Sequence, residues 1–307
     1  MIYYSLIICT YNRSFFLKAT IESILTNFKE KSNYEVLIID NNSTDGTDKM
    51  MLQFSAQPQL KYYKELQQGL SHARNRGIKE ASNDILIFLD DDIEIDKKYL
   101  DILDEIFDNQ SISIAGGKVL PHKATIPEWL PPKYYYLASV FDLGEEARFV
   151  DKLMGANYGM RKEVAKTIGW YDTRLGRKGN SLMGGEENDY FNRAQKFGFK
   201  RYYHPKLIVY HKVANKLTEN YIFNYSFSNG RSQALIDKGN KELKVVLKIA
   251  KYIVMIVAYF LYGFYADMEV ENRPRFQDFI ADMKQVTANV KVLGIYKNGK
   301  VAPSKFK

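Results

Sequence analysis

Three consecutive carboxylates, Asp90, Asp91 and Asp92, directly follow the apolar run 85–89. Adjacent carboxylates repel one another, so folding them together costs free energy unless a cation is present. Asp90 and Asp92 can face one ligand. Mn²⁺ and Mg²⁺ prefer such a partial shell of oxygen atoms, which they complete with diphosphate oxygens. The pattern predicts a divalent-metal site, with a solvated acidic turn at a strand end as the alternative.

A second group of acids lies in the segment 184–189 (GGEEND), which opens a helical pattern. Acids in the first turn of a helix ordinarily complement the helix dipole, and this is the structural alternative. Two features favour a catalytic role for these acids. The glycine pair permits close approach of a ligand, and three crowded acids raise the pKa of a carboxylate toward the range of a general base.

Other polar residues stand at the ends of predicted elements. Asp40 closes the apolar strand 35–40, where a carboxylate can accept hydrogen bonds from the base or ribose of a nucleotide. The segment 71–77 (SHARNRG) opens a helix with two arginines, which suits a phosphate as well as it suits a solvated basic face. His211 ends the last core strand, and a lone histidine is more often structural than a ligand.

An alternation of strands and helices must position these residues. The expected strands are 3–9, 35–40, 60–65, 85–89, 112–120 and 201–211, and the expected helices are 14–27, 47–54, 71–81, 97–107 and 186–197. This order predicts an α/β fold with a mainly parallel sheet flanked by helices, in which ligands bind beyond the carboxyl ends of the strands. The segments 10–12 and 90–92 should meet Asp40 at that edge, and the proline-rich segment 121–149 should be an irregular insertion over it.

Composition sets broader limits on the protein. The chain has 307 residues, 46% of them hydrophobic, which is enough for a buried core and argues against disorder. Its single cysteine, Cys9, excludes an intrachain disulfide and a multi-cysteine metal site. The net charge of +8 favours anionic partners, although we expect no nucleic acid among them. The N-terminus lacks the pattern of a signal peptide, so we expect a cytoplasmic protein.

Six motifs in order give the chain a family resemblance. They are SLIICTYNR (5–13), EVLIIDNNSTDGT (35–47), GLSHARNRGI (69–78), DILIFLDDD (84–92), GANYGMRKEV (155–164) and GGEENDYFNRA (184–194). Each alone is permissive, but together, over roughly the first 215 residues, they resemble the family-2 glycosyltransferases, which have the Rossmann-like GT-A fold. The resemblance implies an inverting, metal-dependent transfer from a nucleotide-diphosphate sugar, usually a UDP-sugar.

The resemblance also implies roles for individual residues. Asp92 would be the most direct ligand of Mn²⁺ or Mg²⁺, together with Asp90 and with His211, which stands where the family often places a metal-binding histidine. The residues implied to contact the nucleotide sugar are Thr10, Tyr11, Asn12, Arg13, Asp40, Asn42, Arg74, Asp90 and Asp91.

The catalytic base is implied by the same comparison. The family carries it in an acid pair of the form GEDxD, which here reads Glu186-Glu187. Glu187 stands at the position of the base and is the expected base, and Asp189 is its rival because the pair departs from the family pattern. Glu186 and Asn157 are the expected acceptor contacts. The base would deprotonate an acceptor hydroxyl, whose oxygen would displace the diphosphate from the opposite face of the sugar.

The expected domain organisation has two parts. Residues 1–215 form the catalytic domain, with a nucleotide-sugar half (1–120) and an acceptor half (121–215), and residues 216–307 form a helical C-terminal region. Within 238–265 a face of five lysines precedes an apolar stretch that is too short to cross a ~30 Å membrane core. Such a helix suits an anionic membrane surface at the inner face of the cell membrane, or packing on the catalytic domain or on a second subunit of a homo-oligomer.

The expected function is transfer of a single sugar to a hydroxyl of a glycan or lipid-linked acceptor, in bacterial surface polysaccharide synthesis. A processive synthase would carry a Gln-x-x-Arg-Trp motif and several membrane spans, which the sequence lacks. Two alternatives remain. A sugar-nucleotide nucleotidyltransferase would show a glycine-rich basic loop after the first strand, and a non-catalytic nucleotide- or carbohydrate-binding protein would not need both groups of acids.

Overall fold

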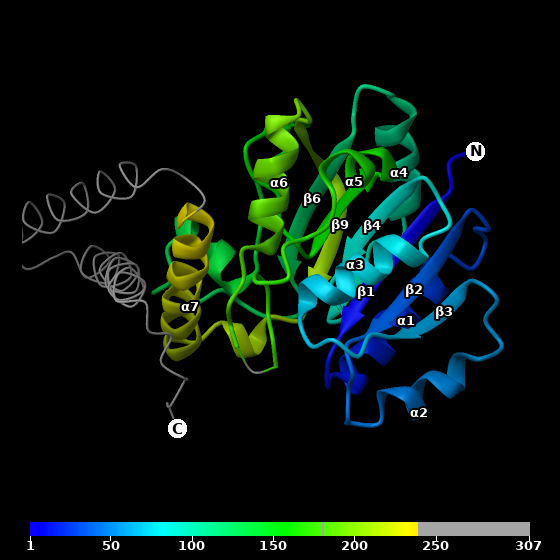
Figure 1. Cartoon of the computed structure of the whole chain (residues 1–307), viewed down its shortest axis with the longest axis horizontal. Coiled ribbons are helices and arrows are strands. Elements are labelled where there is room, and N and C mark those ends of the chain that lie inside the picture. The colour runs from blue at the N-terminus through cyan, green and yellow to red at the C-terminus, as the bar shows by residue number, and fades with distance from the viewer. Residues whose placement is uncertain (180, 239–307) are drawn as a thin grey trace, which may run out of the picture.

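The computed structural model describes residues 1–179 and 181–238, which fold as a mixed α/β structure around one sheet (Figure 1). The strands are β1 (Tyr4–Thr10), β2 (Tyr34–Asp40), β3 (Leu60–Lys64), β4 (Ile85–Leu89), β5 (Ile93–Ile95), β6 (Ile114–Pro121), β7 (Arg148–Val150), β8 (Asn157–Arg161) and β9 (Arg201–His211). The α-helices are α1 (Ser14–Asn27), α2 (Thr47–Met51), α3 (Leu70–Glu80), α4 (Tyr99–Asp108), α5 (Lys162–Ile168), α6 (Glu186–Lys196) and α7 (Glu219–Lys238). Short 3₁₀ segments are η1 (Leu52–Phe54), η2 (Pro132–Ala138) and η3 (Ala214–Lys216).

The N-terminal half of the sheet is parallel, as the alternation of strands and helices predicts. β1 lies between β2 and β4 and is parallel to both, and β3 adds a parallel edge strand beside β2. Beyond β4 the sheet is mixed, because β8 runs antiparallel to both β4 and β6, while β9 is parallel to β6. These pairings give β1, β4, β6 and β9 the same direction, so their carboxyl ends lie at one edge.

Apolar side chains fill both faces of the sheet, as expected for strands that read as continuous hydrophobic runs. In β1, Leu6 and Ile8 point to the cluster that includes the buried sides of α1 and α4. Ile7 points to the opposite cluster, which includes residues of α3, α5 and α6. Alternate side chains of β1 therefore pack against helices on opposite faces of the sheet. The polar residues follow at the ends of the strands.

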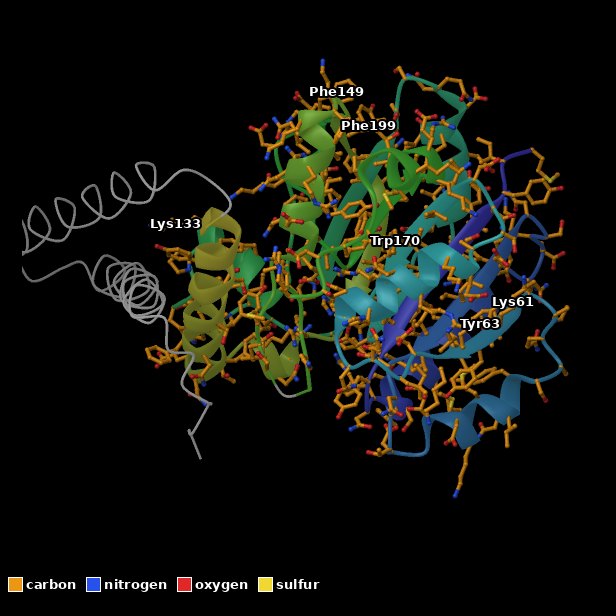
Figure 2. The ribbon with its side chains drawn as sticks, viewed as in Figure 1. Lys61, Tyr63, Lys133, Phe149, Trp170 and Phe199 are labelled. Atoms are coloured by element: carbon orange, nitrogen blue, oxygen red, sulfur yellow. The ribbon has the colours of Figure 1, made fainter. Side chains whose placement is uncertain are left out.

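The outer edge of the sheet carries charge. Figure 2 shows Lys61 and Tyr63 side by side on β3. The Lys61 ammonium lies 2.7 Å from a Glu35 carboxylate oxygen, and Tyr63 packs under the guanidinium of Arg76, 5.6 Å from the ring centroid. A charged lysine on an edge strand disfavours pairing with the edge of another sheet.

The backbones of β6 and β9 approach each other closely at Gly117. A Cβ atom at this position would lie 1.8 Å from the carbonyl oxygen of Leu207, at the point where the register of the two strands shifts. We expect Gly117→Ala to lower the free energy of unfolding by about 3 kcal/mol, because backbone atoms cannot yield as a side chain does. Urea unfolding monitored by circular dichroism measures this loss.

Gly198→Ala is the matched control for this prediction. Gly198 has a φ of +87° but no atom within 4 Å of a Cβ, so its replacement costs only the backbone conformation, about 1 kcal/mol. Equal unfolding midpoints for the two variants would show that the β6–β9 contact does not require glycine.

The segment 121–149 is mostly irregular, as predicted, apart from η2 and the start of β7. Leu130, Leu137 and Val140 of this segment pack against Val213 and Ile222, near the start of α7. The helix expected after residue 217 is present as α7 up to Lys238. The membrane-surface helix predicted for 238–265, and the rest of the C-terminal region, lie outside the described residues. In 1–179 and 181–238, no helix has both the length and the hydropathy of a membrane span.

Candidate active site

A pocket opens at the carboxyl ends of β1 and β4, where the parallel sheet was expected to bind its ligand. Its walls combine segments that lie far apart in the sequence. Those predicted from the sequence to contact ligand are Thr10, Tyr11, Arg13, Arg74, Asp90, Asp91, Glu186 and Glu187. Other lining residues include Cys9, Asn41, Ser139, Arg177, Lys216 and Tyr225.

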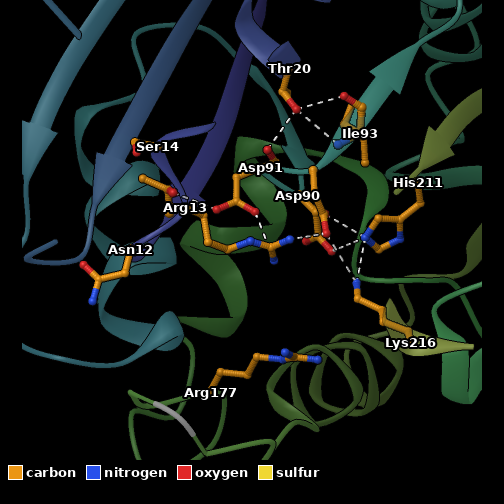
Figure 3. A network of polar contacts seen from close by, with 12 residues as sticks. Asn12, Arg13, Ser14, Thr20, Asp90, Asp91, Ile93, Arg177, His211 and Lys216 are labelled. Carbon is orange, nitrogen blue, oxygen red and sulfur yellow. Dashed lines mark hydrogen bonds and ion pairs between the residues drawn. The ribbon is translucent and has the colours of Figure 1, made fainter. Parts of the chain in front are cut away.

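Asp91 and Arg13 form the floor of the pocket on the β1 side. The Thr10 hydroxyl donates a hydrogen bond of 2.7 Å to Asp91, and a guanidinium nitrogen of Arg13 lies 3.4 Å from the other oxygen of the same carboxylate. Burial raises the pKa of Asp91 to about 6, against the positive charge of Arg13. Thr20 of α1 fixes the backbone here, because its hydroxyl bonds to the Asp91 carbonyl and to Ile93 (Figure 3).

Asp90, Asp92 and His211 come together as one possible metal-binding group. Their ligand atoms all lie within 4.8 Å of one another. His211 Nε2 lies 2.7 Å from Asp92 Oδ1 and 3.6 Å from Asp90 Oδ2. Figure 3 shows the His211 ring directed toward Asp90. Asp92 and His211 are fully buried, whereas Asp90 lines the pocket. The structure therefore joins two residues that the sequence places 119 positions apart, as the family resemblance implied.

The chemistry of this group fits a divalent cation. His211 Nδ1 lies 3.2 Å from the carbonyl oxygen of Ser139, which can only accept, so Nδ1 carries a proton and Nε2 is the nitrogen directed at the acids. Nε2 lies 2.7 Å from Asp92 Oδ1, a buried oxygen with no other donor among the described residues, so a proton on Nε2 or a cation beside the two atoms must satisfy them. One nitrogen and two carboxylate oxygens are suitable ligands for Mn²⁺ or for Mg²⁺.

Lys216 and Arg13 supply positive charge at the same place. The Lys216 ammonium lies 2.9 Å from His211 Nε2 and 3.6 Å from Asp92 Oδ2, and an Arg13 nitrogen lies 2.5 Å from the same Asp92 oxygen. Burial alone would raise the pKa of Asp92, but the neighbouring His211, Lys216 and Arg13 more than offset it and hold the pKa well below its usual range. The Asp92 carboxylate is therefore ionised at neutral pH.

Glu186 and Glu187 stand at the first turn of α6, on the pocket wall. Arg74 of α3 is buried and lies 2.6 Å from Glu186 Oε1 and 3.8 Å from Glu187 Oε2. Arg74, which was expected to contact the nucleotide, lines the pocket, and its guanidinium pairs with the two acids there. Burial, followed by the charge of Glu186, raises the pKa of Glu187 to about 8. A carboxyl group with this pKa suits proton transfer near neutral pH.

Asp189 is directed elsewhere. Its carboxylate lies 2.9 Å from Arg193 in the next turn of α6, and it does not line the pocket. The geometry thus supports Glu187 over its rival as the base.

Asn157 requires a correction. The sequence comparison implied an acceptor contact, but the Asn157 side chain is fully buried at the start of β8. Its amide nitrogen donates to the carbonyl oxygens of Lys118 and Leu207, and its oxygen accepts from the hydroxyl of Tyr99. Every polar atom of this side chain is therefore used to join β8 to its neighbours, so Asn157 is structural.

Three further predicted residues, at the end of β2, in the loop after it and in the connection after β1, lie close together. Asp40 is fully buried and accepts hydrogen bonds from the Tyr62 hydroxyl and the Ser43 amide. Asn12 and Asn42 have left-handed backbone conformations, and the Asn12 side chain accepts from the amide of Thr44. None of the three lines the pocket, and the contacts show them shaping the loop beside it.

The pocket also contains residues that the sequence did not indicate. Lys216 follows His211 by five positions, and Tyr225 lies on α7, a region assigned to a separate C-terminal unit. Arg177 comes from the glycine-containing connection between α5 and α6. The glycines at 176 and 179 were a weak sign of a shaped loop, but nothing in the sequence places it over the sheet edge.

Comparisons with known proteins identify the family of the chain. Residues 5–169 match the model of the family described as glycosyl transferase family 2. The chain is 26% identical over 242 residues to the glucosyl-dolichyl phosphate glucuronosyltransferase of Haloferax volcanii, a match that covers 76% of this chain and 77% of the relative.

Solved structures show the same fold. The mannosyltransferase PcManGT from Pyrobaculum calidifontis, solved with GDP-Man and Mn²⁺, superimposes with a TM-score of 0.66 at 14% identity, covering 94% of this chain and 86% of that one. The structure of S. aureus TarS 1-349 in complex with UDP-GlcNAc superimposes with a TM-score of 0.52 at 17% identity, covering 98% of this chain and 93% of that one. The family model covers more than half of the chain. The chain therefore belongs to glycosyl transferase family 2 and is a glycosyltransferase enzyme with the GT-A fold.

Proposed function

We propose that this enzyme transfers a single sugar, with inversion, from a nucleotide-diphosphate sugar to a hydroxyl group of a glycan or lipid-linked acceptor. The observation that carries the proposal is that Asp90 of the metal-binding group and Glu187, a carboxyl group with a pKa of about 8, line one pocket. An inverting transfer needs a base on one side of the anomeric carbon and a stabilised leaving group on the other.

The residues of the pocket divide the work of this reaction. Asp90, Asp92 and His211 would hold Mn²⁺ or Mg²⁺, which when bound supplies positive charge for the diphosphate leaving group. Glu187 accepts the proton of the acceptor hydroxyl. The hydroxyl oxygen then forms a bond to the anomeric carbon, and the bond from that carbon to the diphosphate oxygen breaks. Arg74 pairs with Glu186 beside the base, and its positive charge partly offsets the rise in the pKa of Glu187 that burial and Glu186 cause.

The proposed donor and acceptor are supported by the residues of the pocket and by the names of similar proteins. The pocket has Thr10, Tyr11 and Arg13 at the end of β1 for the nucleotide side, and we propose a UDP-sugar as the donor. Structural neighbours were solved with UDP-GlcNAc and with GDP-Man, so both nucleotides need testing. The Haloferax relative is named for a lipid-linked saccharide. A lipid-linked acceptor in the assembly of a bacterial surface polysaccharide is accordingly our proposal for this chain.

A thermal-shift panel tests the proposed donor. The full chain is heated with UDP- and GDP-sugars, each with Mn²⁺ and with Mn²⁺ plus a chelator. A donor present at about 100 times its dissociation constant stabilises the protein by about 2.7 kcal/mol, which raises the Tm of a chain of this size by several degrees. We expect such a shift with one nucleotide series, and we expect the chelator to abolish most of it.

The same panel separates the alternatives. A nucleotidyltransferase would be stabilised by a nucleoside triphosphate with a sugar 1-phosphate and would release pyrophosphate from them. A binding protein would show the shift but would not cleave the donor, so slow hydrolysis of the donor to nucleoside diphosphate is measured in parallel. A shift that the chelator leaves unchanged would contradict the metal-dependent site.

A further inference from the structure

Arg177 is a pocket residue whose role is not explained by the reaction above. It lies in the connection between α5 and α6, and its carbonyl oxygen accepts a 2.8 Å hydrogen bond from the amide of Leu70 at the start of α3. The adjacent Gly176 has a φ of +92° and passes close to Ser71 and Glu186. These contacts fix the base of the side chain at the pocket wall. Figure 3 shows the guanidinium extending on the same side of the acidic group as Lys216.

Arg177 differs from the other basic residues of the pocket in its partners. Four basic side chains line the pocket, namely Arg13, Arg74, Arg177 and Lys216. Arg13 pairs with Asp91 and Asp92, Arg74 pairs with Glu186, and Lys216 lies beside Asp92. Within residues 1–179 and 181–238, no carboxylate lies within 4.0 Å of the Arg177 guanidinium.

Two tyrosines of α7 orient the Arg177 side chain. Its Nη2 donates a 3.0 Å hydrogen bond to the hydroxyl of Tyr221, and its guanidinium lies 5.9 Å from the ring centroid of Tyr225. The two rings stack on each other with an interplanar angle of 7°. A half-buried guanidinium that is held by aromatic rings and has most of its donors free is preorganised for an anion.

We propose that Arg177 binds a phosphate group of the substrate, and that this group is the diphosphate of the nucleotide-sugar donor. The inference rests on the proposed function. The planar guanidinium can donate two parallel hydrogen bonds to phosphate oxygens, whereas the other basic groups of the pocket already neutralise carboxylates. Negative charge grows on the diphosphate as the sugar departs, so the same contact stabilises the leaving group and increases the rate of transfer. A lipid-linked acceptor also carries phosphate and is the other possible source of this ligand.

The test compares ligands that differ only in phosphate. Binding of UDP, UMP, GDP and GMP to the full chain with Mn²⁺ is measured by isothermal titration calorimetry for the wild type and for Arg177→Ala. We expect the variant to bind the preferred nucleoside diphosphate about 10- to 100-fold more weakly, and the monophosphate with a much smaller loss. Arg177→Lys keeps the charge but not the planar pair of donors, and should recover only part of the affinity.

Two further variants serve as controls. Arg174→Ala removes an arginine from the same connection, but Arg174 is 83% exposed, pairs with Asp172 and does not line the pocket. It should bind all four nucleotides as the wild type does. Tyr221→Phe removes only the hydroxyl that orients Arg177 and should show a smaller loss that is again greater for the diphosphate. A Tm within a few degrees of the wild type confirms that each variant is folded.

The outcomes distinguish the two proposals. If Arg177→Ala binds nucleoside diphosphates normally but loses affinity for a short-chain isoprenyl phosphate relative to the isoprenyl alcohol, Arg177 binds the phosphate of the acceptor and the donor assignment is overturned. If no phosphate ligand is affected while the wild type binds nucleoside diphosphate, the inference about Arg177 fails and the proposed function stands. If the wild type binds no nucleoside diphosphate, the proposed function fails and the inference fails with it.

Discussion

Glu187→Gln abolishes sugar transfer almost completely, with an expected loss of about 10³- to 10⁴-fold in kcat, because glutamine keeps the size of the side chain but cannot accept the proton of the acceptor. Donor affinity should stay within a few-fold of the wild-type value. The change is measured as transfer from the donor that the thermal-shift panel selects, with dissociation constants from calorimetry. Asp189→Asn is the matched control, since Asp189 pairs with Arg193 outside the pocket. A larger loss in Asp189→Asn than in Glu187→Gln would reverse the assignment of the base.

The pH dependence of transfer follows from the same residue. The base acts only when deprotonated, and burial together with Glu186 raises the pKa of Glu187 to about 8. The rate should therefore increase as the pH rises from 6 to 8 and level off above that range. A rate that is constant between pH 5 and pH 8 would show that the base has an ordinary pKa.

The stability of the folded chain should decrease as the pH rises, whereas the transfer rate increases. Because the pKa of Glu187 is higher in the folded chain than in the unfolded chain, its contribution to stability is present below about pH 4.5 and is lost as the pH rises toward 8. Glu187→Gln removes this loss, so at pH 8 we expect the variant to be more stable by about 1 kcal/mol, or roughly 2–4 °C in Tm. An inactive variant that melts higher than the wild type cannot owe its inactivity to misfolding.

Asp92→Asn is the second large effect, and it acts through metal binding. The substitution removes the negative charge that faces His211, and we expect Mn²⁺ affinity and the transfer rate each to fall by at least about 100-fold. Electron paramagnetic resonance measures free Mn²⁺ directly and does not depend on activity. Unchanged Mn²⁺ binding in this variant would rule out Asp92 as a ligand.

A control for Asp92→Asn must account for its charged neighbours. Arg13 and Lys216 both lie against Asp92, so the variant leaves Lys216 without a carboxylate partner in the described part of the chain and Arg13 with Asp91 alone, and it should be less stable by about 3 kcal/mol. Measurements are therefore made well below its melting temperature. His211→Gln removes a ligand without this imbalance and should weaken Mn²⁺ binding with little change in Tm. Agreement between the two variants attributes the loss to the metal site.

Most of the fold could be predicted from the sequence because local signals are strong there. The runs that form β1, β2 and β4 are apolar throughout and end in polar residues, which indicates buried parallel strands and their carboxyl ends. The antiparallel insertion of β8 between β4 and β6 could not be predicted, because strand pairing depends on contacts remote in sequence. The surface helix expected over 238–265 stays a prediction, since it lies outside the described residues.

The candidate site was predicted where residue type and position both carried information. Asp90 and Asp92 belong to this class, since acids follow a buried strand, whereas His211 was implied only by the family resemblance. Asn157 shows the limit of transfer by position, because an amide can serve a ligand or the backbone and only its partners decide which. Arg177 was missed for the opposite reason: a solvated arginine and one directed into a pocket are identical in sequence.

The metal-binding group has a consequence for how the protein is made. Asp90 and Asp92 leave the ribosome 119 or more residues before His211, which ends β9, the last strand in sequence within residues 1–179 and 181–238. At roughly 5–20 residues per second this interval lasts about 6 to 24 s. During it the carboxylates lack both the imidazole and Lys216, so the nascent chain holds an incomplete chelate. Completion of the proposed metal site is thereby coupled to pairing of β9 with the sheet, and we expect full affinity for the ion only after that strand has paired.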